Sequence, residues 1–227
     1  MTHVISVKGV GKRYERGGRP FWALRGADIT VGEGEFVTLL GRSGSGKSTL
    51  LNIIVGLLRP TEGTAEIAGK NLSEMDDAAA SVLRNELVGY VPQGAGVLGT
   101  LSVIDNVRLP WYMNKRGPEP EGRALALLEQ VGLKDLAEQY PSALSGGELR
   151  RVAIARALMC SPRVIVADEP TSSLDAQTAQ QVVAAFKQLS DQGVAVLMVT
   201  HDDFSISCSD KLYDMAEGVL TLRSPQA

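Results

Sequence analysis

The stretch Gly41-Arg42-Ser43-Gly44-Ser45-Gly46-Lys47-Ser48-Thr49 decides the fold of this chain. It matches the phosphate-binding loop pattern G-x-x-x-x-G-K-[ST] at every fixed position. An apolar run of strand character, residues 35–40, precedes it, and leucine and isoleucine recur at helical spacing over residues 50–58. Strand, loop and helix is the context that this motif needs; the alternative is a glycine turn that leads into a core helix. The flanking residues favour a phosphate-binding loop.

The residue types in this loop explain its expected chemistry. Glycines let the backbone turn tightly and bring its N–H groups close to an anion, and the helix that follows adds its positive N-terminal end. Lys47 would neutralise β- and γ-phosphate oxygens, and the Ser48 hydroxyl would ligate Mg²⁺. All nine residues of the stretch are therefore candidate nucleotide contacts.

Size and composition are those of an ordinary globular protein. The chain has 227 residues, a length that is ample for a hydrophobic core. Its residues are 44% apolar and 22% charged, as is usual for a globular protein. The net charge of −3 without a basic block argues against binding to nucleic acid. Cys160 and Cys208 lack metal-type spacing and are interpreted as buried cytosolic thiols. The longest apolar run, residues 50–58, is far shorter than the roughly 20 residues of a membrane span, so another chain would have to hold this one at a membrane.

The N-terminal part of the chain indicates strands. Residues 4–10 and 26–40 have β character, with turns at 17–20 and 32–34, which predicts an antiparallel sheet ahead of the phosphate loop. Residues 64–69 read as another short strand. A helix is predicted over residues 73–87 with Ser73 as its N-cap, followed by a strand over residues 88–93.

The remainder of the chain indicates an α/β core that contains a helical insertion. Residues 94–160 are mostly helical, with a break at 117–120. The apolar runs 163–167 and 194–199 enclose a helix over residues 176–189, which favours a parallel sheet with helices on both faces. We therefore expect one α/β domain with a P-loop NTPase core. It would comprise a catalytic core (1–93 and 161–227) that includes the N-terminal antiparallel β part, and an inserted α-helical subdomain (94–160).

Two carboxylates follow the predicted strand 163–167. Asp168 stands where a buried strand ends beside the phosphate loop, the usual place for a Mg²⁺ ligand. Glu169, one residue further along the chain, can reach toward an attacking water, and as a general base it would contribute about 10²–10⁴-fold in rate. The alternative is an acidic strand end that opens a surface turn at Pro170-Thr171.

A second glycine-containing segment, Leu144-Ser145-Gly146-Gly147-Glu148, precedes a helix predicted from about residue 148 to 159. A serine and two glycines before a helix form a second anion-binding site, although alone they could be a simple cap. Two phosphate-seeking loops for one nucleotide suggest that two copies of the domain share their sites.

Seven motifs in order give the chain a resemblance to the ATPase subunits of ABC transporters over about residues 4–222. They are Tyr14, the phosphate loop 41–49, Gln93, the signature L-S-G-G-E (144–148), V-I-V-A-D-E-P (164–170), S-L-D (173–175) and T-H-D (200–202). The resemblance implies an ATPase that uses ATP and Mg²⁺ and dimerises head to tail.

The resemblance also implies roles for individual residues. Tyr14 would stack on adenine, and Gln93 would sense Mg²⁺ and the γ-phosphate. Ser145, Gly146 and Gly147 would bind the γ-phosphate held by the other copy. Asp175 would communicate across the dimer, and His201 would contact the γ-phosphate. The expected catalytic residues are Glu169, His201, Lys47 and Gln93, and the expected metal ligands are Ser48, Gln93 and Asp168.

Finer likeness at residues 89–93, 101–110 and 167–171 is to the subfamily that serves lipoprotein release, macrolide and peptide efflux, haem export and cell-division signalling. Three possibilities follow. The chain would be the ATPase subunit at the cytoplasmic face of the cell membrane, driving a separate permease for export or extraction of an amphipathic substrate. It would otherwise be a mechanotransmitter that regulates an envelope process, or a soluble ATPase without a membrane partner. Two segments depart from the subfamily pattern, Ala95–Gly99 and Leu149-Arg150.

Overall fold

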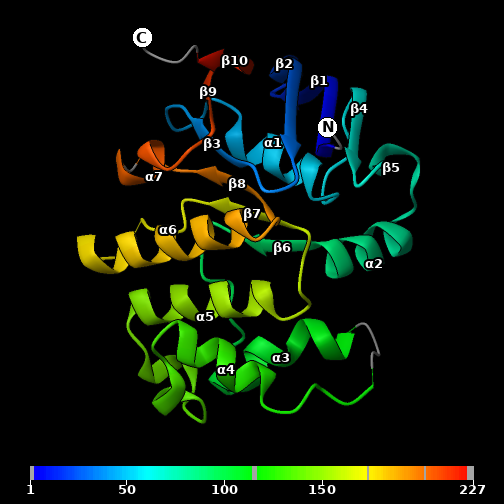
Figure 1. The fold of residues 1–227 in the computed structure, drawn as a ribbon. Coiled ribbons are helices and arrows are strands. Elements are labelled where there is room, and N and C mark those ends of the chain that lie inside the picture. Colours follow the sequence, from blue (N-terminus) through cyan, green and yellow to red (C-terminus); the bar gives the residue numbers. More distant parts are fainter. Residues whose placement is uncertain (1–2, 114–116, 173, 202, 224–227) are drawn as a thin grey trace.

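A computed structural model describes residues 3–113, 117–172, 174–201 and 203–223. Two sheets organise them, as Figure 1 shows. The smaller sheet has the order β2-β1-β4-β5, and its described pairs are all antiparallel. Its strands are β1 (His3–Arg16), β2 (Arg19–Gly32), β4 (Glu62–Ile67) and β5 (Lys70–Asn71). The predicted N-terminal antiparallel sheet is therefore confirmed, although its first turn is confined to Gly17 and Gly18 and β2 already begins at Arg19.

The larger sheet has the order β10-β9-β3-β8-β7-β6. The five strands from β9 to β6 run parallel, and β10 pairs antiparallel with β9. The strands are β3 (Phe36–Leu40), β6 (Val88–Val91), β7 (Val164–Asp168), β8 (Ala195–Val199), β9 (Lys211–Ala216) and β10 (Val219–Arg223). The mostly parallel sheet is confirmed, and the hairpin β9–β10 is an addition that the sequence pattern did not predict.

Helices cover both faces of the larger sheet, and strand alternation explains how. In β8, Leu197 and Val199 belong to a core shared with α1 (Lys47–Ile54) and the smaller sheet. Val196 and Met198 point the other way and pack in a second core with Phe186 of α6 (Ala176–Asp191). Because side chains alternate along a strand, an uninterrupted apolar run serves two cores at once.

The segment between β6 and β7 is helical, as predicted. It contains α3 (Val103–Met113), α4 (Arg123–Gln130) and α5 (Gly146–Leu158), with single turns at Lys134–Leu136 and Pro141–Ala143. These elements have a third core of their own, and α5 contributes to it and to the second core. In Figure 1 α3 and α4 lie at the end of the molecule opposite β10, with α5 between them and the larger sheet.

Two helix starts differ from the sequence prediction. The helix α2 (Asp77–Leu87) begins after Asp76, whose Oδ1 accepts a hydrogen bond from Ala79 N at 2.7 Å; Ser73 lies in a preceding single turn, Leu72–Glu74. Aspartate and serine are about equally good N-caps, and Asp76 is the cap here because its side chain reaches the N–H of Ala79 and adds negative charge at the helix start. The helix α5 begins at Gly146 instead of residue 148, so the two signature glycines form its first turn.

A further helix, α7 (Asp203–Ser207), follows β8. In the described part of the chain, no helix combines the length and the apolar character that crossing a membrane requires.

Candidate ATP site

The phosphate loop connects β3 to α1, and at Gly41 and Gly46 both the backbone angle and the close packing exclude a side chain. Gly41 and Gly46 have φ values of +155° and +113°. A Cβ atom at Gly41 would lie 2.4 Å from Met215 O, and one at Gly46 would lie 2.4 Å from Ala23 O. Both contacts are far closer than a side chain tolerates. Because glycine has no Cβ atom, the loop can pack directly against the backbone of β9 and β2.

The side chain of Lys47 points back into the phosphate loop. This side chain is buried, and its Nζ donates to Gly41 O at 2.6 Å and to Arg42 O at 2.9 Å. The ammonium is thus directed to the centre of the loop, where backbone N–H groups and a helix N-terminus favour an anion. Ser45 Oγ is also buried here and has no hydrogen-bond partner among the described residues.

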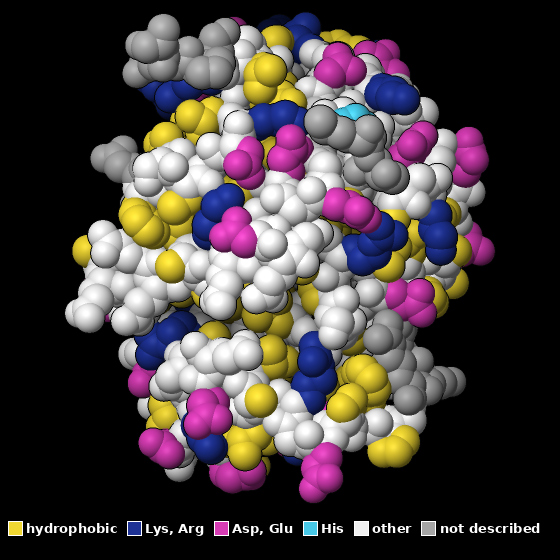
Figure 2. Space-filling view, viewed as in Figure 1, with side chains coloured by type: hydrophobic (Ala, Val, Ile, Leu, Met, Phe, Trp, Pro, Cys, Tyr) yellow, Lys and Arg dark blue, Asp and Glu magenta, His cyan; other side chains and the backbone are white. Residues whose placement is uncertain are grey.

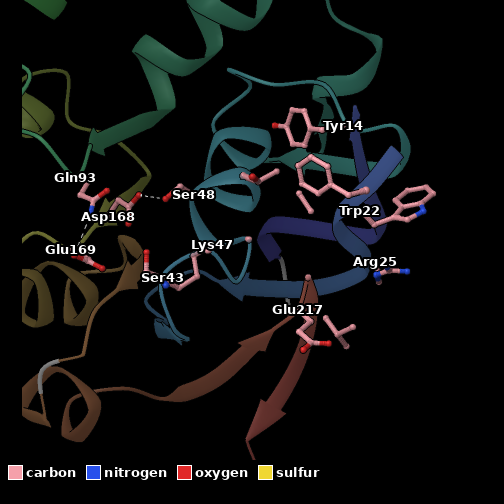
Figure 3. A pocket seen from close by; sticks show the side chains of 17 residues that line it. Tyr14, Trp22, Arg25, Ser43, Lys47, Ser48, Gln93, Asp168, Glu169 and Glu217 are labelled. Carbon is pink, nitrogen blue, oxygen red and sulfur yellow. Dashed lines mark hydrogen bonds between the residues drawn. The ribbon is translucent and has the colours of Figure 1, made fainter. Parts of the chain in front are cut away.

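The side chains of Ser48 and Asp168 contact each other where β7 ends. Ser48 Oγ donates to Asp168 Oδ2 at 2.9 Å, which joins the first turn of α1 to the end of β7 (Figure 3). Asp168 is only 3% exposed, and burial raises the pKa of its carboxyl. The Ser48 hydrogen bond lowers that pKa, Glu169 raises it, and Lys47 and Arg150 lower it. A hydroxyl and a carboxylate side by side fit Mg²⁺, which prefers oxygen ligands.

Glu169 is held in an unusual backbone conformation next to Asp168. Its φ is +48°, a region that non-glycine residues rarely adopt, and its backbone N–H donates to Val199 O at 2.9 Å. Gln93 Nε2 donates to Glu169 Oε2 at 3.4 Å, and His201 Nε2 lies 3.9 Å from Glu169 Oε1. Three residues predicted to be catalytic are therefore brought together from the ends of β6, β7 and β8.

These groups line a cleft of about 620 Å³. Figure 3 shows Lys47, Ser48, Asp168, Glu169 and Gln93 at one end and Tyr14 with Trp22 at the other. Most of the predicted phosphate-loop residues line it: Ser43, Gly44, Gly46, Lys47, Ser48 and Thr49. The lining does not include Gly41, Arg42, Ser45 or His201.

The far end of the cleft is aromatic. The rings of Tyr14 and Phe21 stack with centroids 5.8 Å apart and planes inclined by 27°. Stacked aromatic faces next to a phosphate loop suit a nucleotide base. Sequence reasoning found Tyr14 but missed Phe21 and Trp22 in the next strand, although an aromatic pair after a glycine turn was a usable signal. It also missed the remaining lining residues: Ala23, Arg25, Glu217, Gly218 and Val219.

The signature residues lie elsewhere. Ser145 caps α5: its Oγ accepts from Glu148 N at 3.3 Å and donates to Glu148 Oε2 at 2.7 Å. Among the described residues, the cleft lining does not include Ser145, Gly146 or Gly147. Asp175 caps α6 by accepting from Thr178 N at 3.0 Å. Ser173 and Asp202, which belong to the S-L-D and T-H-D motifs, are outside the described residues.

Comparison with known proteins decides the family. The family model described as ABC transporter matches residues 24–172. This chain belongs to the ABC transporter family. It is an ATP-binding cassette, the ATPase subunit of a transporter.

Individual relatives agree with this result. The lipoprotein-releasing system ATP-binding protein LolD of Alcanivorax borkumensis is 41% identical over 224 residues, which cover 96% of this chain and 97% of that protein. The macrolide export ATP-binding/permease protein MacB of Shigella flexneri is 38% identical; this cassette is covered completely but spans only 35% of MacB. A dimeric structure of the cassette MJ0796 bound to ADP and Pi matches with a TM-score of 0.93 and 35% identity, covering 98% of this chain and 99% of that one.

Proposed function

We propose that two copies of this ATPase bind two ATP molecules head to tail and drive a separate membrane permease that exports or extracts an amphipathic or hydrophobic substrate. The observation that carries the proposal is the incomplete cleft. It contains a phosphate loop, two carboxylates, Gln93 and a stacked aromatic wall, but its lining among the described residues lacks Ser145–Gly147. A second copy that supplies its own signature helix completes the site.

Each residue then has a chemical task. Tyr14 stacks on adenine, the loop N–H groups and Lys47 hold the phosphates, and Ser145 with Gly146 and Gly147 binds the γ-phosphate of the other copy. Glu169 accepts a proton from the attacking water, which Gln93 and His201 help to orient. Ser48, Asp168 and Gln93 would hold Mg²⁺, which draws charge away from the phosphate oxygens when bound.

The relatives support a location and a partner. LolD belongs by its name to a lipoprotein-releasing system and MacB to macrolide export with a fused permease. We place this cassette at the cytoplasmic face of the cell membrane, held there by an integral membrane subunit. On the face drawn in Figure 2, the described acidic and basic side chains are interspersed and do not form the basic stripe that is typical of nucleic-acid binding.

The substitution Glu169→Gln tests the proposed site. It removes the general base but keeps the size of the side chain, so ATP binding should persist while turnover falls by about 10²–10⁴-fold. With hydrolysis blocked, ATP should hold the variant as a dimer in gel filtration. Wild-type turnover would refute the assignment of Glu169, and an ATP-loaded variant that stays monomeric would refute the shared site. Glu129→Gln, the same change at an exposed carboxylate of α4, is the control and should keep wild-type turnover.

A second experiment separates export from regulation. The cassette should co-purify with an integral membrane protein, and vesicles containing both should show ATP-dependent extraction or movement of a lipoprotein, peptide, macrolide or haem. ATPase activity that is coupled to the partner but moves none of these compounds would favour a mechanotransmitter that regulates an envelope process. Absence of any membrane partner would favour a soluble ATPase.

A further inference from the structure

Arg150 is the most unusual charged residue outside the cleft lining. It lies in the second turn of α5 and is only 4% exposed, and its guanidinium donates to two backbone carbonyls and a hydroxyl. Burial lowers the pKa of its guanidinium, while the nearby charges of Asp168 and Glu169 raise it. Burying a cation costs free energy unless hydrogen bonds and neighbouring charges compensate for it. The contacts of Arg150 therefore need an explanation.

The guanidinium joins three elements at one point. Its Nη1 donates to Pro92 O at 2.6 Å, and its Nη2 donates to Gln93 O. Nη2 also donates to Ser172 Oγ at 3.2 Å. One rigid side chain thus links α5 to the segment after β6 and to the loop after β7. The planar fork of arginine suits this task because its donors have fixed relative directions.

Two of the three residues that Arg150 binds, Gln93 and Ser172, contact Glu169 directly. Gln93, whose carbonyl Arg150 binds, donates its side-chain amide to Glu169 Oε2 at 3.4 Å. Ser172, whose hydroxyl Arg150 binds, donates its backbone N–H to Glu169 O at 3.3 Å. In Figure 3 Gln93 and Glu169 face each other beside Asp168. The position of Glu169 is therefore supported from two sides by groups that Arg150 holds.

A second arginine shows that the contact extends along α5. Arg156 donates from Nη1 to Gly96 O at 2.7 Å and from Nη2 to Ala95 O at 3.1 Å. Four carbonyls between residues 92 and 96 are consequently bound by one helix. That helix begins directly after Ser145, so the signature serine and the Gln93 segment are parts of one connected unit.

We propose that Arg150 is a positioning residue for ATP hydrolysis, which fixes Gln93 and the Ser172 loop so that Glu169 faces the reacting water. The inference rests on the proposed roles of Glu169 and Gln93. It predicts a loss in the rate of the chemical step, with ATP binding preserved, because Arg150 does not line the cleft.

The test compares Arg150 with a matched arginine that contacts the same helix. In the 227-residue chain, Arg150→Ala should lower kcat by about 10- to 100-fold, the usual effect of losing a supporting contact at a reacting group, with KM for ATP nearly unchanged. Arg150→Lys, which keeps the charge and part of the donor set, should recover part of kcat. Arg123 donates to Leu158 O, Met159 O and Ser161 Oγ at the other end of α5. Arg123→Ala should lower the melting temperature while leaving kcat unchanged.

Several results would overturn the inference. One is a wild-type kcat in Arg150→Ala, and another is a fall in kcat/KM of that variant that comes from a raised KM for ATP. A third is an equal fall in kcat in Arg123→Ala. Should Arg150→Ala not fold, Arg150→Lys and Arg150→Gln decide: both should fold and show reduced kcat, and wild-type rates in both would contradict the proposal.

A double-mutant cycle gives a readout that a purely structural role would not produce. If Arg150 acts through Gln93, then Arg150→Ala combined with Gln93→Ala should lose about as much kcat as the larger single change. Multiplied losses would contradict the part of the proposal in which Arg150 acts through Gln93. Glu169→Gln in the same assay separates the hypotheses: an inactive Glu169→Gln with a fully active Arg150→Ala refutes this inference alone, whereas an active Glu169→Gln refutes the proposed base.

Discussion

Asp168 shows how a residue suited to a metal site can lower the stability of the chain. Its carboxyl is buried at the end of β7, and the balance of its surroundings raises its pKa above the ordinary value of 3.8. A carboxyl with a raised pKa binds its proton more tightly in the folded chain than in the unfolded chain. Its contribution to stability is therefore fully present below about pH 4 and is lost as the pH rises through the raised folded pKa.

This sign leads to a prediction for the nucleotide-free protein. Asp168→Asn removes the buried charge but keeps an oxygen that can accept the hydrogen bond of Ser48. At pH 7–8 we expect the melting temperature to rise by about 2–4 °C, which corresponds to roughly 1 kcal/mol for a chain of this length. The gain should shrink as the pH falls toward 4. Thermal melts in a chelator at several pH values measure it, and a gain that grows on acidification would show that burial of the charged carboxylate is not its cause.

At the scale of elements, apolar periodicity was a good predictor where burial was complete. The strands β7 and β8 are buried at every residue, and residues 164–167 of β7 and all of β8 form uninterrupted apolar runs in the sequence. The hairpin β9–β10 was missed because β9 is only partly buried, β10 is mostly exposed, and both strands are mixed in polarity. The start of α2 was misplaced because Ser73 and Asp76 both precede a helical pattern, and only the structure shows which side chain reaches a backbone N–H.

The candidate site was predictable to a similar degree. Gly41–Thr49, Asp168 and Glu169 follow from local patterns, since each lies where a strand ends. Tyr14, Gln93 and His201 came only from the resemblance to a family, and the structure places them at one cleft or beside Glu169. Arg25 and Glu217 carried no local signal, because their places in the lining depend on strands that meet only in the folded chain.

At the scale of the whole molecule, the signature residues Ser145–Gly147 are separate from the cleft lining. The cleft lining and Ser145–Gly147 do not overlap among the described residues. A head-to-tail pair would bring each signature to the other copy's phosphate loop, with the same surfaces used twice. Hydrolysis should consequently be a property of the pair.

Dilution and subunit mixing test this arrangement. Specific ATPase activity should rise with chain concentration and then level off, and constant activity from a proven monomer would refute it.

A sharper test mixes Lys47→Ala with Ser145→Arg, each inactive alone. A mixed head-to-tail dimer has one site with an intact loop and an intact signature, so mixing should restore activity. Failure of the mixture, with both variants folded and able to pair, would contradict the shared site.

The hairpin β9–β10 has a consequence for how the protein is made. Its turn completes the wall behind the phosphate loop: Gly218 N donates to Ser45 O at 2.9 Å, and Gly218 O accepts from Arg25 N at 2.8 Å. The ribosome synthesises residues 41–49 long before residue 218. At about 5–20 residues per second, the nascent loop waits on the order of ten seconds for its last neighbour. During translation the unfinished chain should be unable to hold ATP firmly, and affinity for the nucleotide should arise only once the strands after β8 have docked.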